Sequence, residues 1–232
     1  MHGEKNAEIV SGPILDERFW FTPDIKRYFT DEETLDTLNV RGPFHSYTAY
    51  TIALMQKYIH VAEVQKDLTF MHSHLPRLRA FCQVLPSFAD RLDDTQIRLA
   101  HKDLHFANIL YDQSSGRVSG VLDWEFASTV PYQICDPVSA FLWSAKPLSD
   151  DVRAARDRLR ARFAEICNNN SDVPGAKALV EDAEFTSELQ EKMHKVSNMM
   201  RIIVTLIPRG QFVERAGAFV DDLLGNLEAF GV

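Results

Sequence analysis

A broad apolar stripe over residues 47–65 limits the folds open to this chain more than any other part of the sequence. Its apolar residues recur at steps of three and four, the period of an α-helix, and further apolar residues widen the stripe. The recurring set is Tyr47, Tyr50, Leu54, Tyr58 and Val61, and the widening set is Ile52, Met55, Ile59 and Ala62. Ser46 can cap the N-terminus of this helix. A stripe this wide predicts a largely buried helix.

A second helical pattern covers residues 67–84 and contains Pro76. Proline lacks the amide hydrogen and clashes with the preceding turn, so we expect this helix to break or kink there. The opening of the chain is less regular. Residues 8–15 indicate a short strand or hairpin, and a polar and aromatic connector follows through Arg41.

The last third of the chain is predicted to be helical. Ser149 can cap a helix over residues 150–167, and two further helices are predicted over residues 184–207 and 211–230. The charged run in the first of these helices is interpreted as the exposed face of an amphipathic helix. Its apolar residues, expected to turn inward, are Val152, Leu159 and Phe163.

Short strands interrupt the helical patterns in the middle of the chain. Residues 96–100, 109–111 and 118–122 indicate strands, and residues 112–117 indicate the turn between the last two. The expected fold class is therefore mainly α with a small β insert, an α+β arrangement. The strands hold between them the polar loop that begins at His101.

This loop carries the residues that indicate chemistry. It reads His-Lys-Asp-Leu-His-Phe-Ala-Asn from residue 101, and Asp-Trp-Glu follows the predicted strand 118–122 at residues 123–125. Phosphoryl transfer needs a carboxylate that orients the acceptor and oxygen ligands that hold Mg²⁺ against nucleotide phosphates. Asp103, Asn108 and Asp123 provide such groups, and Mg²⁺ prefers hard oxygen ligands.

Two other interpretations apply to the same loop. Asp and Asn side chains commonly cap helices and form turns, without any catalytic role. The string His101, Asp103 and His105 could also form a transition-metal site, but the sequence has no second cluster of metal-binding residues to complete it. Trp124 and Trp143, which have apolar neighbours, are interpreted as core residues.

The loop, the Asp-Trp-Glu segment and a downstream Cys-Asp-Pro at residues 135–137 together resemble the aminoglycoside phosphotransferase and choline-kinase-like family, in the form common among fungal paralogues. The resemblance spans about residues 100–143, with similar short segments at residues 12–14, 19–20 and 41–44. It implies the C-terminal lobe of the protein-kinase-like fold. The implied domains are a hinge-proximal connector over residues 1–45 and a helical catalytic domain over residues 46–232, with the β-hairpin catalytic and metal loops at residues 97–123.

The resemblance also implies roles for individual residues. Asp103 is the expected catalytic base, Asn108 and Asp123 are the expected Mg²⁺ ligands, and His101 is expected to brace the loop and to contribute with them to cofactor binding. Asp136 is expected to anchor the loop from the start of the next helix. His105 and Glu125 flank the site, where each is either a substrate contact or a solvated loop residue.

The expected cofactors are ATP, as phosphoryl donor, and Mg²⁺. The first 100 residues contain no glycine-rich phosphate loop and no Val-Ala-Ile-Lys-type strand, so the lobe that grips ATP in this family is expected to be absent. The resemblance predicts transfer of the ATP γ-phosphoryl group to a hydroxyl of a small molecule, impaired by that absence. The alternative is a degenerate or repurposed relative that binds a metabolite or catalyses another reaction.

Composition narrows the expected partners. A formal charge of −8 argues against nonspecific nucleic-acid binding and is compatible with a cationic or neutral small-molecule acceptor. The surface left by an absent lobe would favour self-association. Three widely spaced cysteines suggest buried thiols in a reducing compartment, and no leader or membrane span is recognisable, so we expect a cytoplasmic protein that does not enter membranes.

Overall fold

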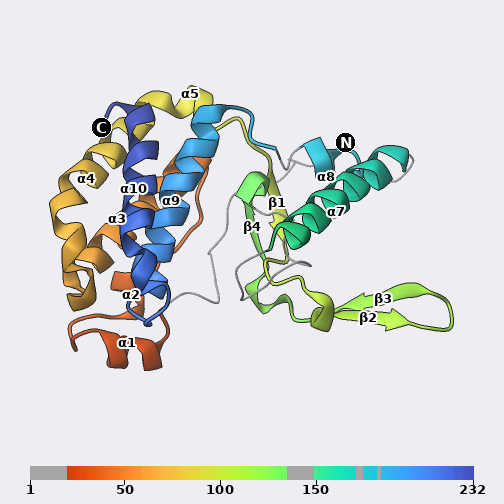
Figure 1. Ribbon diagram of the computed structural model, residues 1–232, viewed down its shortest axis with the longest axis horizontal. Helices are drawn as coiled ribbons and strands as arrows, with labels where there is room; N and C mark the ends of the chain where they lie inside the picture. The colour runs from red at the N-terminus through yellow and green to blue at the C-terminus, as the bar shows by residue number, and fades with distance from the viewer. Residues whose placement is uncertain (1–19, 135–148, 171–174, 182–183) are drawn as a thin grey trace, which may run out of the picture. The chain divides into compact units, whose positions relative to one another are not determined.

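The computed structural model describes residues 20–134, 149–170, 175–181 and 184–232, and these divide into two compact units (Figure 1). The helical unit contains the described residues of segments 10–94 and 186–232, and the mixed unit contains those of segment 95–185. Residues on both sides of position 45 lie in the helical unit, and the predicted domain boundary there stays a prediction.

The helical unit is built from α-helices and short 3₁₀-helices. In chain order they are α1 (Thr22–Tyr28), α2 (Leu35–Leu38), α3 (Tyr47–Val64), η1 (Lys66–His74), α4 (Leu75–Val84), η2 (Leu85–Phe88), α5 (Ala89–Leu92), α9 (Glu188–Leu206), η6 (Val213–Arg215), α10 (Ala216–Leu227) and η7 (Glu228–Phe230). The apolar stripe over residues 47–65 is therefore confirmed as one long helix, α3.

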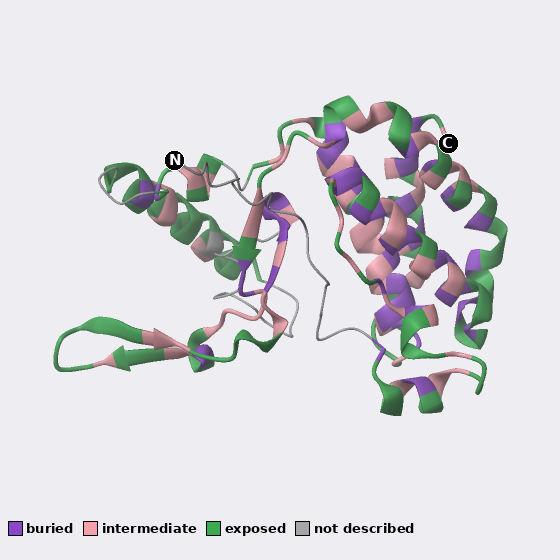
Figure 2. Ribbon diagram, turned by 180° about the vertical axis from the view of Figure 1, so that it is seen from behind, coloured by how far each residue is buried: buried purple, intermediate pink, exposed green. Residues whose placement is uncertain are grey.

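The core of the helical unit lies between α3, α4, α9 and α10, which pack side by side (Figure 1). Buried side chains line the inner faces of these helices (Figure 2), and Met55, Phe81, Met200 and Leu223 have no exposed surface. Burying a side chain of this size stabilises the fold by about 1.5–3 kcal/mol, so this packing is the main source of the unit's stability.

Two helix starts in the helical unit agree with the sequence prediction, and one differs from it. Ser46 Oγ accepts a hydrogen bond from Ala49 N at 3.1 Å at the start of α3. The predicted break near Pro76 is confirmed, with Pro76 in the first turn of α4, where a missing amide costs nothing. The last helix starts later than predicted, because Phe212 has a left-handed backbone (φ 57°) that interrupts the helical path before α10.

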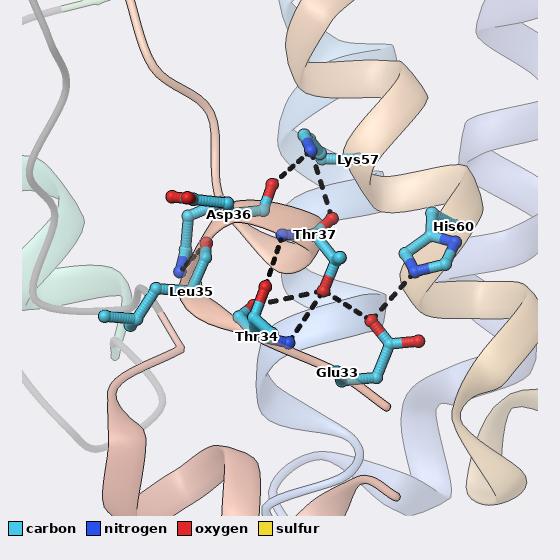
Figure 3. A network of polar contacts seen from close by, with 8 residues as sticks. Glu33, Thr34, Leu35, Asp36, Thr37, Lys57 and His60 are labelled. Carbon is cyan, nitrogen blue, oxygen red and sulfur yellow. Dashed lines mark hydrogen bonds and ion pairs between the residues drawn. The ribbon is translucent and has the colours of Figure 1, made fainter. Parts of the chain in front are cut away.

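A polar network fixes the segment that was expected to be an irregular connector (Figure 3). Thr34 and Thr37 form a capping box on α2, and the Thr37 hydroxyl also donates to Glu33 Oε2 at 2.6 Å. His60 on α3 contacts the same carboxylate oxygen at 2.9 Å. Lys57, one turn earlier on α3, donates to the carbonyl of Asp36 at 2.5 Å. These contacts hold α2 against α3, although α2 alone is far too short to be stable.

Glu33 is the charged centre of this network, and its side chain is only 8% exposed. Burial raises the pKa of Glu33, but hydrogen bonds from Thr37 and His60 and the charges of His60 and Lys57 outweigh burial and hold the pKa below its ordinary value of 4.5. A carboxyl group with a lowered pKa stabilises the folded state above its unfolded pKa. This stabilisation is lost as the pH falls through the folded-state value.

We therefore expect Glu33→Gln to lower the free energy of unfolding by about 1 kcal/mol at neutral pH. The difference from the wild type should shrink as the pH falls from 4.5 through the lower folded-state pKa, because the carboxylate is protonated first in the unfolded chain and only then in the folded protein. Urea unfolding between pH 7 and pH 3 measures this. Glu32→Gln, which removes the same charge from an exposed neighbour, is the control. An equal loss in both variants at neutral pH would contradict the network's role.

The mixed unit contains two small antiparallel sheets, which confirms a mainly helical chain with a small β component. Its elements are β1 (Ile97–Ala100), η3 (Phe106–Asn108), β2 (Ile109–Asp112), β3 (Arg117–Val121), η4 (Trp124–Phe126), β4 (Ser128–Pro131), η5 (Tyr132–Ile134), α7 (Asp150–Asn169) and α8 (Ala178–Glu181). The strand β4 was not predicted. It pairs with β1, with Ala100 opposite Ser128, and this pairing fixes the two ends of the segment that carries the site.

Two further findings bear on the sequence predictions. Among the described residues, no helix is both long enough and apolar enough to cross a membrane.

Val152 and Leu159 on α7 do not turn inward as predicted, since they are 40% and 47% exposed. The predicted helix itself is present, and Ser149 caps it by accepting from Val152 N at 3.4 Å.

Candidate functional site

The site lies in the mixed unit on two loops between strands. The first loop runs from the end of β1 through η3 to β2, and the second follows β3. In the β2–β3 hairpin Ile109 lies opposite Val121, so Asn108 and Leu122 continue the pairing. Leu122 N donates to Asn108 O at 2.8 Å, which brings the start of the second loop to the end of the first.

His101 ties the two loops together at a second point. Its Nε2 donates to the carbonyl of Leu122 at 2.7 Å across 21 residues, and its ring meets Trp124 edge-on with centroids 4.8 Å apart. The His101 side chain is buried, as expected for a residue that holds backbone in place. Both polar groups of the Leu122 backbone are therefore bonded to the first loop, immediately before Asp123.

Asn108 and Asp103 are in direct contact. Asn108 is buried, and its Nδ2 donates to the backbone oxygen of Asp103 at 2.9 Å and lies 3.5 Å from Asp103 Oδ2. Because Nδ2 faces Asp103, the amide oxygen Oδ1 lies on the other side of the amide group. The Asp103 side chain itself is 27% exposed, so its carboxylate can meet a ligand.

His105 lies beside the same carboxylate. Its Nδ1 accepts a hydrogen bond from Ala107 N at 3.2 Å, and its Nε2 lies 3.3 Å from Asn108 Nδ2. The same Nε2 lies 3.6 Å from Asp103 Oδ1. His105 is thus both a cap of η3 and a neighbour of Asp103.

Asp123 has an uncommon backbone conformation. It lies in the left-handed region (φ 60°, ψ 61°), which costs energy for most side chains but is tolerated by Asp and Asn. Its carboxylate is exposed and makes no capping hydrogen bond to η4. Lys102 in the first loop is also left-handed (φ 65°), so both loops have strained backbone close to the site.

The remaining predicted residues have different outcomes. Glu125 is exposed on η4, two residues after Asp123. Trp124 is not the core residue that was predicted, because it is 51% exposed; its indole Nε1 donates to Val121 O at 3.0 Å. Asp136 and Trp143 lie outside the described residues.

The transition-metal interpretation gains no support, since the described residues contain no group of three His, Cys, Asp or Glu side chains placed to hold a metal ion.

Leu122 is the residue that sequence reasoning missed. It acts through its backbone, so its side chain type gives no signal of the role. Its place as the last residue of the predicted strand 118–122, immediately before Asp123, was the available clue, because a strand end that continues its pairing bonds to the neighbouring loop.

We expect the conformation of Asp123 to decide which substitutions the loop tolerates. Asp123→Asn keeps a side chain suited to φ 60°, so its free energy of unfolding should stay within about 0.5 kcal/mol of the wild type. Asp123→Val should lower it by about 1–3 kcal/mol, because a β-branched residue is strained there. Urea unfolding of both variants measures this, and equal stability of the two would contradict the strained conformation.

Comparison with known proteins gives one match. A family model described as "Phosphotransferase enzyme family" matches residues 44–166, more than half of the 232 residues, and this range includes both loops of the site. No match was found among curated proteins or among solved structures.

Proposed function

Because the chain belongs to the phosphotransferase enzyme family, we propose that it transfers the γ-phosphoryl group of ATP to a hydroxyl of a small molecule. The observation that carries this proposal is the junction at Leu122, which brings Asp123 to the loop where Asn108 bonds Asp103. A base and two hard oxygen ligands on adjoining loops are what phosphoryl transfer requires of a protein.

Asp103 is the proposed catalytic base. It accepts the proton of the acceptor hydroxyl as the oxygen of that hydroxyl bonds to the γ-phosphorus and ADP leaves. Asn108 fixes the backbone of Asp103, and His105 Nε2 lies beside the carboxylate at 3.6 Å. The partial exposure of Asp103 leaves room for the acceptor.

Asn108 and Asp123 are the proposed Mg²⁺ ligands. Their donor atoms, an amide oxygen and an exposed carboxylate, fit a metal that binds one or two protein oxygens and completes its shell with phosphates and water. When bound, the metal would neutralise charge on the transferring phosphoryl group. His101 contributes to cofactor binding indirectly, by holding the carbonyl next to Asp123.

We propose the chemical class of the acceptor from the charged side chains that are exposed near the site. Asp123 and Glu125 are both exposed, and Trp124, which is 51% exposed, comes between them in the sequence. Carboxylates next to an aromatic face favour a cationic acceptor such as an amino alcohol. The proposal includes a finer family assignment, a fungal-type C-terminal lobe of the kinase-like fold, which the loop motifs support. It also includes a cytoplasmic location, which the free thiols Cys82 and Cys167 support.

Nucleotide binding is the first test. We expect calorimetry to show that ATP binds only with Mg²⁺, and that Asp123→Asn raises the Kd by about 10–100-fold, because one ligand of the metal loses its charge. The Asn side chain suits the backbone at this position, so a loss of affinity would not reflect unfolding. Binding that depends on neither Mg²⁺ nor Asp123 would refute the proposed site.

Turnover is the second test. ADP release is measured with Mg²⁺-ATP and a panel of amino alcohols, polyols and nucleosides. We expect Asp103→Asn to lower kcat by about 10²–10⁴-fold, because the acceptor proton then has no base. Asp112→Asn, the same change in the nearby hairpin turn, should leave kcat unchanged. A wild type that binds Mg²⁺-ATP but turns over no acceptor, or a fully active Asp103→Asn, would refute the transfer reaction.

A further inference from the structure

Helix α7 has an apolar stripe that the described structure leaves exposed. The stripe consists of Val152, Leu159 and Ile166, which are 40%, 47% and 46% exposed. An α-helix advances about 100° per residue, so three residues spaced by seven lie within about 40° of one another. Phe163, half-buried, borders the same stripe. The stripe has one apolar position in each heptad, with Phe163 beside it, and gives α7 a narrow apolar side along which another helix can pack.

Arginines border this stripe on both sides. By the same helical geometry, Arg158 and Arg162 lie along one edge and Arg153 and Arg160 along the other. All four side chains are exposed. Glu165 pairs with Arg162 and Asp150 with Arg153, both at the surface, where such pairs contribute little to stability.

The charge of this segment is opposite to that of the whole chain. The whole of α7 contains five arginines against three aspartates and one glutamate, a formal charge of 5 − 4 = +1, and its central residues 153–162 carry 5 − 1 = +4, whereas the full chain carries −8. A cationic segment around an exposed apolar stripe is complementary to an apolar surface flanked by carboxylates.

We propose that α7 is a binding surface for an acidic amphipathic helix of another protein. The apolar residues of that helix pack on Val152, Leu159 and Ile166, and its carboxylates pair with the bordering arginines. This inference is independent of phosphoryl transfer, because it uses none of the residues assigned to the site.

Charge argues against a second copy of this chain on the same surface. Two α7 helices packed antiparallel about Leu159 would bring the same edge of each copy together, so Arg158 would lie near Arg158 of the other copy and Arg160 near Arg160. Parallel packing would bring the edge with Arg158 and Arg162 beside the edge with Arg153 and Arg160. Like charges along a helix pair oppose association. A bilayer is also a poorer fit, since α7 contains no Trp or Tyr and its apolar stripe is narrow.

The test uses the full chain and a synthetic probe. The probe is a fluorescent peptide of three heptads, with Leu at the two apolar positions of each heptad and Glu at the flanking positions. We expect saturable binding by fluorescence anisotropy that weakens as salt is raised. A peptide of the same composition in scrambled order should bind at least tenfold more weakly, because it lacks the apolar stripe.

Two matched variants separate the surface from general charge. Arg158→Gln/Arg162→Gln removes two positive charges beside the stripe, and Ala154→Glu/Ala161→Glu adds two negative charges on the far side of the same helix. Both lower the net charge by two. We expect only the first to weaken peptide binding, by about tenfold, and Leu159→Ser to weaken it similarly, with circular dichroism confirming that each variant is folded.

Three outcomes would overturn the proposal. The first is that the peptide does not bind the wild type. The second is that the far-side variant weakens binding as much as the arginine variant does. The third is that sedimentation shows the chain binding phosphatidylserine-containing vesicles through these arginines while the peptide does not bind. The last result would assign α7 to an anionic membrane surface instead.

Discussion

The arrangement of the site depends on the backbone of one residue, Leu122. Its amide donates to Asn108 and its carbonyl accepts from His101, so the loop that carries Asp123 is held to the loop that carries Asp103. Neither contact involves the Leu122 side chain. Each such hydrogen bond contributes only about 1 kcal/mol, but the two together set the direction in which the chain leaves β3. The positions of the chemical groups follow from that direction.

The sequence predicted the elements that local pattern controls. The stripe of α3, the break before Pro76 and the caps at Ser46 and Ser149 all depend on residues close together in the chain, and all four were found. The polar residues of the loop could be named because their types and spacing are specific. Their proximity could be inferred only because two short strands bracket them.

Features set by distant contacts could not be predicted in this way. The strand β4 is four residues long and gains its identity from pairing with β1, about 30 residues earlier. The helix α2 exists because Lys57 and His60 on α3 bond its residues and Glu33. Trp124 has apolar neighbours in the sequence but is 51% exposed in the fold, where its ring meets His101 and its Nε1 donates to Val121 O.

The helical unit is discontinuous in sequence, and this affects how the chain can acquire its structure during translation. The helix α3 packs on α9, and Tyr47 contacts His194 across 147 residues, with the mixed unit encoded between them. A ribosome adding about 5–20 residues per second needs roughly 6–25 s to make the 124 residues from Val64 to Glu188. For that time the apolar face of α3 has no partner from the C-terminal helices. All the described residues of the mixed unit are therefore synthesised before the helical unit can close.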